Sequence, residues 1–434
     1  MPEILPAPPF TGIELLLIIV YLLLFGSLIY RFGALQLRGL PPIASVAAFG
    51  VKAIFGLAFI TYHFHRYGIN DAYNYFLHSE AIWQAKKELG IEAYFRLAMG
   101  ANDTYLSPAM FRYAWDSEYW SDAGAYSILR FHAIIHWFTG GYYYVNGVFM
   151  AMIMYWAGLN FYLIFTHYNY DNKNINSNNK YLVAALVFSV PSVLFWTAGI
   201  HKDGMIYACV SWALWQTTKL LHRRTTVLNV AISIIQIIIA CLLLAMFRSY
   251  LLPILLVSLL IYAYLTLYNK NILIQYCSLM VLGGLTIWLG VVFLHVPLLA
   301  KLAQRQADFL AEWGNSDFTV PILQPTWQSL IVNTPRALKN AILRPYFWQA
   351  DTVFKIITGI EPILLLGGVA VLWWRRQRYT ATPLTYFLLT YAVANCLMIG
   401  LLLSNAGTLV RYRTVALHLL VLCVLSFCKS ERKI

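Results

Sequence analysis

The sequence predicts an all-α polytopic membrane protein with about eleven transmembrane helices and with interfacial helices in two extracytoplasmic loops. Three observations lead to this prediction. Of the 434 residues, 60% are hydrophobic and only 11% are charged, with a mean hydropathy of +0.64. Soluble domains carry about 25% charged residues. Apolar runs of about 20 residues recur along the chain, and charged residues are distributed unevenly between the loops that join them.

Each apolar run is long enough to cross a bilayer, and each must be helical, because backbone groups cannot remain unpaired in lipid. The predicted spans lie at 13–30, 41–62, 146–166, 181–200, 203–221, 227–246, 250–268, 272–294, 356–374, 383–404 and 411–428.

Basic residues predict the orientation of these spans. The short loops at 31–40, 167–180, 219–226, 269–271, 375–382 and 429–434 hold 14 of the 31 Lys and Arg residues but 2 of the 18 Asp and Glu residues. Such loops are expected on the cytoplasmic side. The N-terminus is therefore expected outside and the C-terminus inside, with residues 1–434 forming one transmembrane domain.

Two long connections, 63–145 and 295–355, then face outward. Within the first, residues 125–139 have a helical pattern but contain Arg130, His132 and His136, which are costly at the centre of a bilayer. This segment is expected to lie on the outer surface as an interfacial helix. The i, i+4 spacing of the two histidines can bind metal, but no HExxH motif surrounds them, so no metal site is predicted.

Polar residues converge on the predicted outer face. The candidate site residues are Asp71, Glu80, His201, Lys202, Arg248, Trp348, Asp351, Arg411 and Arg413. Arginine offers a planar fork for phosphate oxygens, and a carboxylate such as Asp71 can take a proton from a hydroxyl group. Fixed cations and a base at one leaflet suit a sugar donor linked to a lipid phosphate.

Structural interpretations of the same residues remain open. Arginines at span ends often anchor a helix to lipid headgroups, and tryptophans often mark the interface. Asp71 also fits a cap of a helix over 72–89, because Asn70-Asp71 precedes a helical pattern. Lys202 and Asp203 also fit an ion pair in a tight hairpin.

The segment GINDAYNYFLHSEAI resembles the first outer loop of GT-C-type integral membrane glycosyltransferases. The resemblance implies that Asp71 activates the acceptor, with Glu80 as a substitute. PSVLFWTAGIHKDG and NAGTLVRYR are similar to segments of bacterial envelope proteins grouped with GT-C enzymes and with polysaccharide polymerases. The chain departs from the GT-C pattern: the acidic residue follows the second span rather than the first, Asp71-Ala72 replaces the common Asp-Glu pair, and the large soluble C-terminal domain of some members has no counterpart in this sequence.

The expected function is therefore an extracytoplasmic glycosyltransferase of the bacterial inner membrane. It would move a sugar from a polyprenyl phosphate or pyrophosphate to a glycan, lipid or protein acceptor. Asp71 would act as the base. Lys202, Arg248, Arg411 and Arg413 would hold the phosphate, and His201, Trp348 and Asp351 would complete the substrate site. Neither a P-loop nor a GxGxxG motif is found, which is consistent with a lipid-linked donor.

Three alternatives remain. A polysaccharide polymerase that joins lipid-linked repeat units fits Arg411 and Arg413 equally well. A transporter or flippase would place polar groups near the bilayer midplane, where Lys52 is the main charge. A structural partner subunit is the third. The net charge of +13 suggests contact with anionic lipid rather than nucleic acid, because the chain has no soluble basic domain. The sequence leaves the cofactor, including any divalent cation, unidentified.

Overall fold

The computed structural model describes residues 10–67, 70–100, 106–115, 119–120, 122–167, 177–222, 226–268, 270–311, 318–349, 353–374 and 379–429. Backbone contacts divide the chain into two compact units, which are described separately below. Unit 1 comprises Met1–Thr166, Asn174–Gln216 and Thr226–Leu252. Unit 2 comprises His167–Lys173, Thr217–Thr225 and Pro253–Ile434.

Within the described residues, seven helices are long and apolar enough to cross a membrane. They are Gly12–Arg31, Pro42–His65, Tyr143–Thr166, Val227–Phe247, Ile272–Phe293, Pro383–Leu402 and Ala406–Ser426. Two shorter apolar helices are Asn179–Phe188 and Leu251–Leu267. The prediction of a multi-pass membrane protein built from helices is thus confirmed.

Most of unit 1 is helical. Its helices are α1 (Gly12–Arg31), α2 (Pro42–Tyr67), α3 (Asp71–Leu89), α4 (Ile91–Met99), α5 (Pro108–Trp115), α6 (Ala123–Thr139), α7 (Tyr143–His167), α8 (Ser177–Phe188), α9 (Pro191–Trp196), the first part of α10 (Lys202–His222), and α11 (Val227–Phe247), with a 3-10 turn at Gly33–Leu35. Helix α7 forms the centre of unit 1, because 78% of the residues in its most apolar stretch are buried, against 17% for α1. Helix α1 therefore offers most of its surface to lipid.

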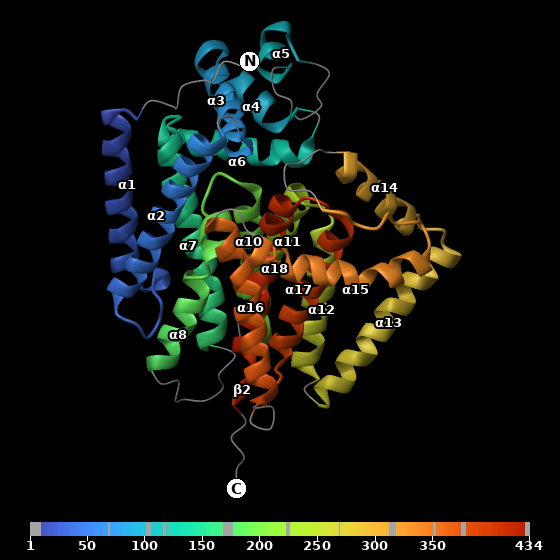
Figure 1. Ribbon diagram of the computed structural model, residues 1–434. Helices are drawn as coiled ribbons and strands as arrows, with labels where there is room; N and C mark the ends of the chain where they lie inside the picture. The colour runs from blue at the N-terminus through green and yellow to red at the C-terminus, as the bar shows by residue number, and fades with distance from the viewer. Residues whose placement is uncertain are drawn as a thin grey trace. The chain divides into compact units, whose positions relative to one another are not determined.

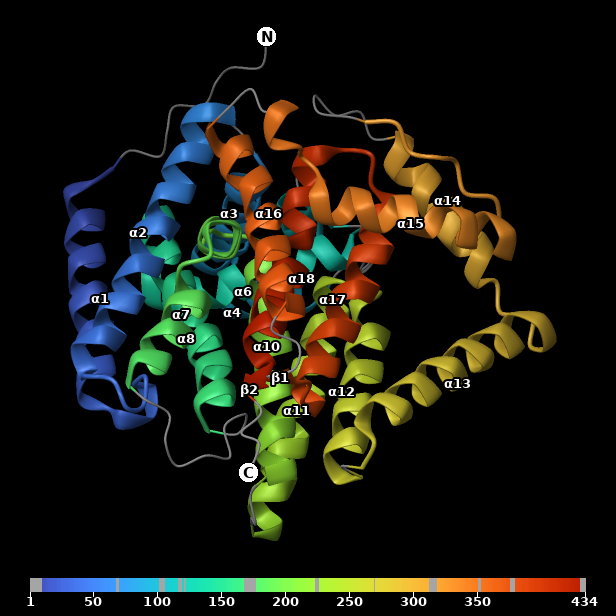
Figure 2. The same ribbon diagram turned by 60° about the horizontal axis from the view of Figure 1, so that its bottom comes forward.

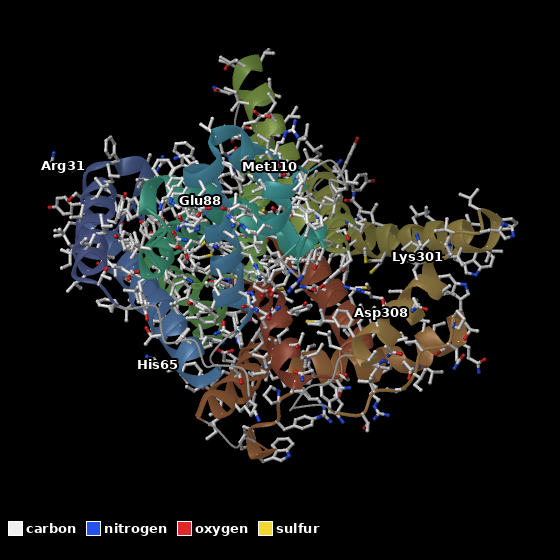
Figure 3. All side chains as sticks on the ribbon, turned by 90° about the horizontal axis from the view of Figure 1, so that it is seen from above. Arg31, His65, Glu88, Met110, Lys301 and Asp308 are labelled. Atoms are coloured by element: carbon white, nitrogen blue, oxygen red, sulfur yellow. The ribbon has the colours of Figure 1, made fainter. Side chains whose placement is uncertain are left out.

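The first long loop of the sequence folds into four helices, α3 to α6, at one end of unit 1 (Figure 1). Helix α3 packs on α4 and α6, and α6 in turn contacts α11. Figure 3 looks onto this end and shows Glu88 of α3 near Met110 of α5. Arg112, two residues after Met110 on α5, forms an ion pair with Glu88 at 3.0 Å. Helix α6, the segment expected at the interface, is not among the seven spanning helices.

The predicted span 181–200 is wrong as one continuous helix. Helix α8 ends at Phe188, and the short α9 begins at Pro191. Proline has no backbone N–H and therefore starts a helix readily but interrupts one that is already running. After α9, residues Thr197 to His201 form a buried non-helical turn before α10. Non-helical backbone is tolerated at membrane depth only where protein or a cavity surrounds it.

Unit 2 contains the end of α10 and the helices that follow α11. These are α12 (Leu251–Leu267, from Pro253 onward), α13 (Ile272–Phe293), α14 (Leu298–Ala311), α15 (Trp327–Leu343), a 3-10 turn (Phe347–Gln349), α16 (Val353–Trp374), α17 (Pro383–Leu402) and α18 (Ala406–Ser426). Strands β1 (Tyr379–Thr380) and β2 (Cys428–Lys429) form an antiparallel pair. Lys301 and Asp308 lie along α14 (Figure 3).

Helix α15 lies across α17 and α18 rather than along them (Figure 2). Gly400 of α17 makes this close crossing possible, because any side chain there would collide with the carbonyl of Ala337 on α15. The predicted span 411–428 begins too late. Helix α18 starts at Ala406, after the cap residue Asn405, so Arg411 and Arg413 lie within the helix.

Candidate functional site

Helix α3 begins at the acidic residue that the sequence singles out. Asn70 is the N-cap, and its side-chain oxygen accepts hydrogen bonds from the backbone N–H groups of Ala72 and Tyr73 at 3.0 and 3.3 Å. Asp71 is therefore the first helical residue rather than the cap, and its side chain is exposed. A carboxylate in the first turn is favoured by the helix dipole. Capping alone thus does not account for Asp71.

Glu80, the second candidate base, lies farther along α3 and is half-buried. Its Oε1 accepts a hydrogen bond from Gln84 Nε2 at 3.3 Å, one helical turn away. The local bond gives Glu80 a structural partner on its own helix.

A buried charged cluster joins the start of α10 to the end of α11. Arg248 caps α11, and its Nη2 lies 2.9 Å from Oδ1 of Asp203 in the first turn of α10. Nδ1 of His201 lies 3.5 Å from the other carboxylate oxygen. The side chain of Asp203 is 1% exposed and that of Arg248 is 9% exposed. Two charges at such burial are tolerable only as a pair with further hydrogen bonds.

Tyr75 connects this cluster to α3. Its ring meets the His201 ring edge-to-face, with centroids 5.8 Å apart. The ammonium group of Lys202 lies 5.8 Å from the centre of the same ring. Because Asp71 and Tyr75 are four residues apart, they share one face of α3. The structure therefore brings His201 and Lys202 to the ring of Tyr75, one helical turn from the predicted base Asp71 on α3.

The buried turn before α10 is held against α2. Phe59 stacks on His63 at 3.9 Å and meets His201 edge-to-face at 6.2 Å. Lys52 of α2 is fully buried, and its ammonium group lies 3.5 Å from the hydroxyl of Thr197. The ring of Tyr207 lies 5.9 Å from the same ammonium group. No carboxylate pairs with Lys52 among the described residues, so a hydroxyl and a ring are its nearest polar contacts.

A second polar cluster has the residue types of a nucleophilic triad. Ser79 Oγ lies 2.9 Å from Nε2 of His136, and Nδ1 of His136 lies 3.4 Å from Nδ2 of Asn146. The amide of Asn146 can only donate there, because its oxygen accepts from Thr139 at 2.6 Å. The imidazole must then carry its proton on Nε2 and donate it to Ser79, which itself donates to the carbonyl of Phe76.

This proton arrangement is the reverse of the one a nucleophile needs, since the imidazole cannot accept a proton from the serine. All four side chains are buried. Burial lowers the pKa of His136 to about 3, with a smaller contribution from Lys87, and lowers the pKa of His132 to about 3, with a contribution from His136. Both imidazoles are therefore neutral, and the cluster joins α3, α6 and α7.

Unit 2 holds Arg411, Arg413 and Trp348. Arg413 is 1% exposed. Its guanidinium group donates to the carbonyls of Ala341, Ile342, Arg344 and Thr358. The first three belong to the C-terminal end of α15, whose last carbonyls lack partners within the helix. Arg413 thus caps α15 and ties it to α16.

The other candidates in unit 2 are more accessible. Arg411 is half-buried, with its guanidinium group 5.3 Å from the centre of the Tyr412 ring. Trp348 is 67% exposed and stacks on Tyr346, with ring centres 4.8 Å apart and an interplanar angle of 5°. Asp351 lies outside the described residues.

Two cavities lie within unit 2. The larger, of about 520 Å³, is apolar and lies between α16, α17 and α18, and its size falls in the range of ligand pockets. Its lining includes Leu365, Val369, Leu389, Leu420 and Val424.

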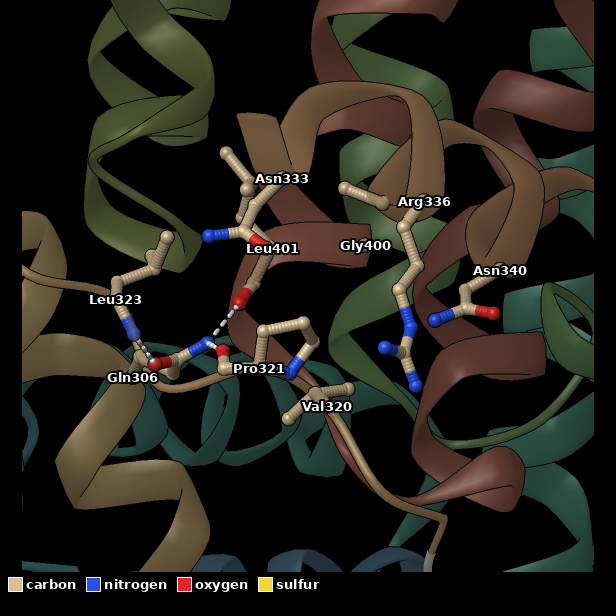
Figure 4. A pocket seen from close by; sticks show the side chains of 10 residues that line it. Gln306, Val320, Pro321, Leu323, Asn333, Arg336, Asn340, Gly400 and Leu401 are labelled. Atoms are coloured by element: carbon tan, nitrogen blue, oxygen red, sulfur yellow. Dashed lines mark hydrogen bonds between the residues drawn. The ribbon is translucent and has the colours of Figure 1, made fainter. Parts of the chain in front are cut away.

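The smaller cavity, of about 10 Å³, holds no more than a water molecule. Figure 4 shows that Gln306 closes it by bonding to Leu323, Pro321 and Leu401, while Arg336 and Asn340 of α15 line the other side. Its size excludes a substrate.

Sequence reasoning missed Glu14 and Tyr75 as key contacts. Glu14 of α1 is buried, and its carboxylate accepts the backbone N–H of Tyr144 at 2.8 Å at the start of α7. It is a cap supplied from another helix, and a carboxylate within a predicted span was the available signal. The i, i+4 spacing from Asp71 was the signal for Tyr75.

Compared with protein-family models, with curated proteins and with solved structures, the chain shows no match. Among the described residues, no group of three or more His, Cys, Asp or Glu side chains is arranged to hold a metal ion. The function is therefore inferred from the side chains that come together in unit 1.

Proposed function

We propose that the protein is a glycosyltransferase that takes a sugar from a polyprenyl phosphate or pyrophosphate donor. It would work at the extracytoplasmic face of a bacterial inner membrane, in a GT-C-like fold with about eleven spans. The acceptor would be an envelope glycan, lipid or protein. The observation that carries this proposal is the contact of Tyr75 with His201 and Lys202, which brings an imidazole and an ammonium group to the face of α3 that bears Asp71.

The chemistry needs a base and an anion site close together. An acceptor hydroxyl attacks the anomeric carbon of the sugar, the bond from that carbon to the phosphate oxygen breaks, and the lipid phosphate leaves with the electron pair. Asp71, exposed at the start of α3, takes the hydroxyl proton. Lys202, half-buried, faces the leaving phosphate and stabilises its growing charge.

The buried members of the site have a supporting part in this scheme. Asp203 forms an ion pair with Arg248 at 2.9 Å. Arg248 therefore holds the first turn of α10 in place rather than binding phosphate directly. His201 lies between Asp203 and Tyr75 and fixes the ring on which Lys202 rests. The preceding turn is buried and held by α2, which keeps these groups in place.

The direct test is transfer by purified protein in nanodiscs, with a polyprenyl phosphate sugar donor and a mixture of acceptors. Asp71→Asn is expected to reduce turnover at least about a hundredfold, as loss of a general base does. Glu80→Gln is the matched control on the same helix and is expected to retain turnover, because Glu80 is engaged by Gln84. Lys202→Met is expected to slow transfer with an unchanged melting temperature.

Equal turnover in wild type and in Asp71→Asn would exclude Asp71 as the base. Loss of transfer only in Glu80→Gln would reassign the base to Glu80.

A further inference from the structure

Lys86 of α3 is held in an aromatic clamp. Its ammonium group lies 4.0 Å from the centre of the Trp83 ring and 3.3 Å from the centre of the Trp137 ring. Tyr94 completes the group, with its ring 5.7 Å from Trp137. Cations over indole faces are attracted by the ring quadrupole, which fixes the position of the ammonium group but leaves its N–H donors unsatisfied. No carboxylate pairs with Lys86 among the described residues.

The clamp borders an apolar surface on α6. Ile134, Trp137 and Phe138 are 52%, 44% and 61% exposed, although the rest of the C-terminal half of this helix is mainly buried. The hydroxyl of Tyr21, in the middle of α1, donates to the carbonyl of Phe138. Since α1 is a membrane-spanning helix, this bond makes the exposed face of α6 continuous with a lipid-facing surface.

Helix α4 extends the same kind of surface. Ile91, Phe95 and Met99 recur every four residues and are 54%, 50% and 70% exposed. The adjacent row is charged, with Glu92 and Arg96 paired at 3.5 Å. An apolar row beside a charged row is the pattern of a helix that lies in the plane of a membrane interface.

We propose that these faces of α4 and α6 are embedded in the outer part of one leaflet, and that Lys86 binds the phosphate of an anionic lipid headgroup there. Tryptophan is enriched at membrane–water interfaces, so Trp83 and Trp137 are of the residue type expected beside lipid headgroups. A phosphate oxygen supplies the acceptors that the clamped ammonium group needs, and the chains of the same lipid lie along Trp137 and Phe138. The surface and its ligand are independent of glycosyl transfer.

Two matched pairs of variants test this proposal in the full-length protein. Nitroxide labels at Phe95→Cys and Arg96→Cys, in nanodiscs of phosphatidylcholine and phosphatidylglycerol, report depth through relaxation by oxygen and by a water-soluble nickel chelate. The label at 95 is expected to respond mainly to oxygen, and the label at 96 mainly to nickel. Nickel access at 95 equal to that at 96 would overturn the proposal.

The second pair is Lys86→Met and Lys87→Met, both tested for phosphatidylglycerol binding by native mass spectrometry. Lys87 is exposed and outside the clamp. Lys86→Met is expected to weaken the tightest binding about fivefold, the effect of one cation near a membrane surface, while Lys87→Met changes it little. Equal binding by the two variants would also overturn the proposal. An unchanged melting temperature in both variants separates a binding effect from misfolding.

Discussion

Arg248 in unit 1 and Arg413 in unit 2 are both buried, but they are neutralised in different ways. Arg248 faces the carboxylate of Asp203, with His201 beside it. Arg413 faces four backbone carbonyls, three at the end of α15 and one within α16, and the carboxylate of Glu361 interacts with it electrostatically. From sequence, both are arginines at the outer ends of predicted spans, and nothing in the sequence separates them.

The difference shows what each arginine can do. Among the described residues, the hydrogen bonds of Arg413 all go to main-chain carbonyls, so its charge serves to hold α15 onto α16 and α18. Arg248 shares a charged cluster with side chains that extend to Tyr75 and Lys202, where the chemistry is proposed. Arg413 therefore stabilises the backbone at the end of α15, whereas Arg248 positions side chains of the proposed site. Substitutions at both arginines and at other buried groups test this distinction.

Replacing Arg413 is expected to cause the largest loss of stability. In Arg413→Met, the carbonyls at the end of α15 lose their donors, and buried carbonyls without partners cost about 1–3 kcal/mol each. A total loss of about 3–6 kcal/mol follows, seen as a lower melting temperature in detergent. Arg413→Lys is the control, and it should be intermediate, because an ammonium group cannot reach all four carbonyls. Wild-type stability in Arg413→Met would show that the carbonyl contacts contribute little.

Breaking the other pair is expected to cost about 3 kcal/mol. Asp203→Asn leaves the guanidinium group of Arg248 buried without its carboxylate. The double variant Asp203→Asn with Arg248→Met should recover most of that loss, because no unpaired charge remains. Transfer activity should stay low in the double variant even after stability returns. Additive losses of stability in the two single variants would show that the side chains are not coupled.

The neutral histidines of α6 are expected to make stability depend on pH. His132 and His136 have folded-state pKa values of about 3, below the 6.5 of a free imidazole. The unfolded chain therefore binds more protons than the folded one between these values, and stability falls as the pH drops below 6.5. At pH 5 the loss is about 2 kcal/mol per histidine.

His132 offers a clean test of this dependence, because neither of its ring nitrogens has a hydrogen-bond partner among the described residues. His132→Leu should match wild type at pH 7 and lose less stability by pH 5, as followed by melting temperature. His65→Leu, at an exposed position on α2, should retain the wild-type pH profile. Parallel profiles for wild type and His132→Leu would contradict the expectation.

Lys52 is expected to give the smallest change in stability. Within the part of the chain that the structure describes, its ammonium group meets neither a carboxylate nor a set of carbonyls, and its polar contacts are a hydroxyl at 3.5 Å and a ring at 5.9 Å. Lys52→Met replaces a poorly paired buried charge with an apolar chain of similar volume, so the melting temperature should be unchanged or higher. A loss of transfer activity in this stable variant would assign Lys52 to the working site. A large loss of stability would instead show an essential structural contact.

The sequence predicts the helical membrane architecture because apolar length and composition are local properties. Helices α1, α2, α7, α11, α13 and α17 lie close to their predicted spans. Pro191 was a signal for the break between α8 and α9, but the run 181–200 is so apolar that it was predicted as one span. The start of α18 was missed because the polar stretch 404–408 before the predicted span resembles a loop. The burial of Arg413 within a helix is explained by tertiary contacts with carbonyls of α15 and α16.

The candidate site was predictable in part. Local chemistry identified Asp71, His201, Lys202 and Arg248 as residues of one face, but pairing depends on tertiary contacts. The sequence placed Lys202 with Asp203, whereas Asp203 forms its ion pair with Arg248, 45 positions along the chain. Tyr75, which connects the two parts of the site, was marked among 30 tyrosines only by its i, i+4 spacing from Asp71.

The most direct test of the central claim, that Asp71 beside Lys202 transfers a sugar from a lipid-linked donor, is mass spectrometry of polyprenyl-linked glycans in cells. Cells would carry wild type or Asp71→Asn at matched protein levels. If Asp71 is the base, one lipid-linked sugar accumulates only in the cells that carry Asp71→Asn. An unchanged lipid-linked pool together with intact envelope glycans would contradict it.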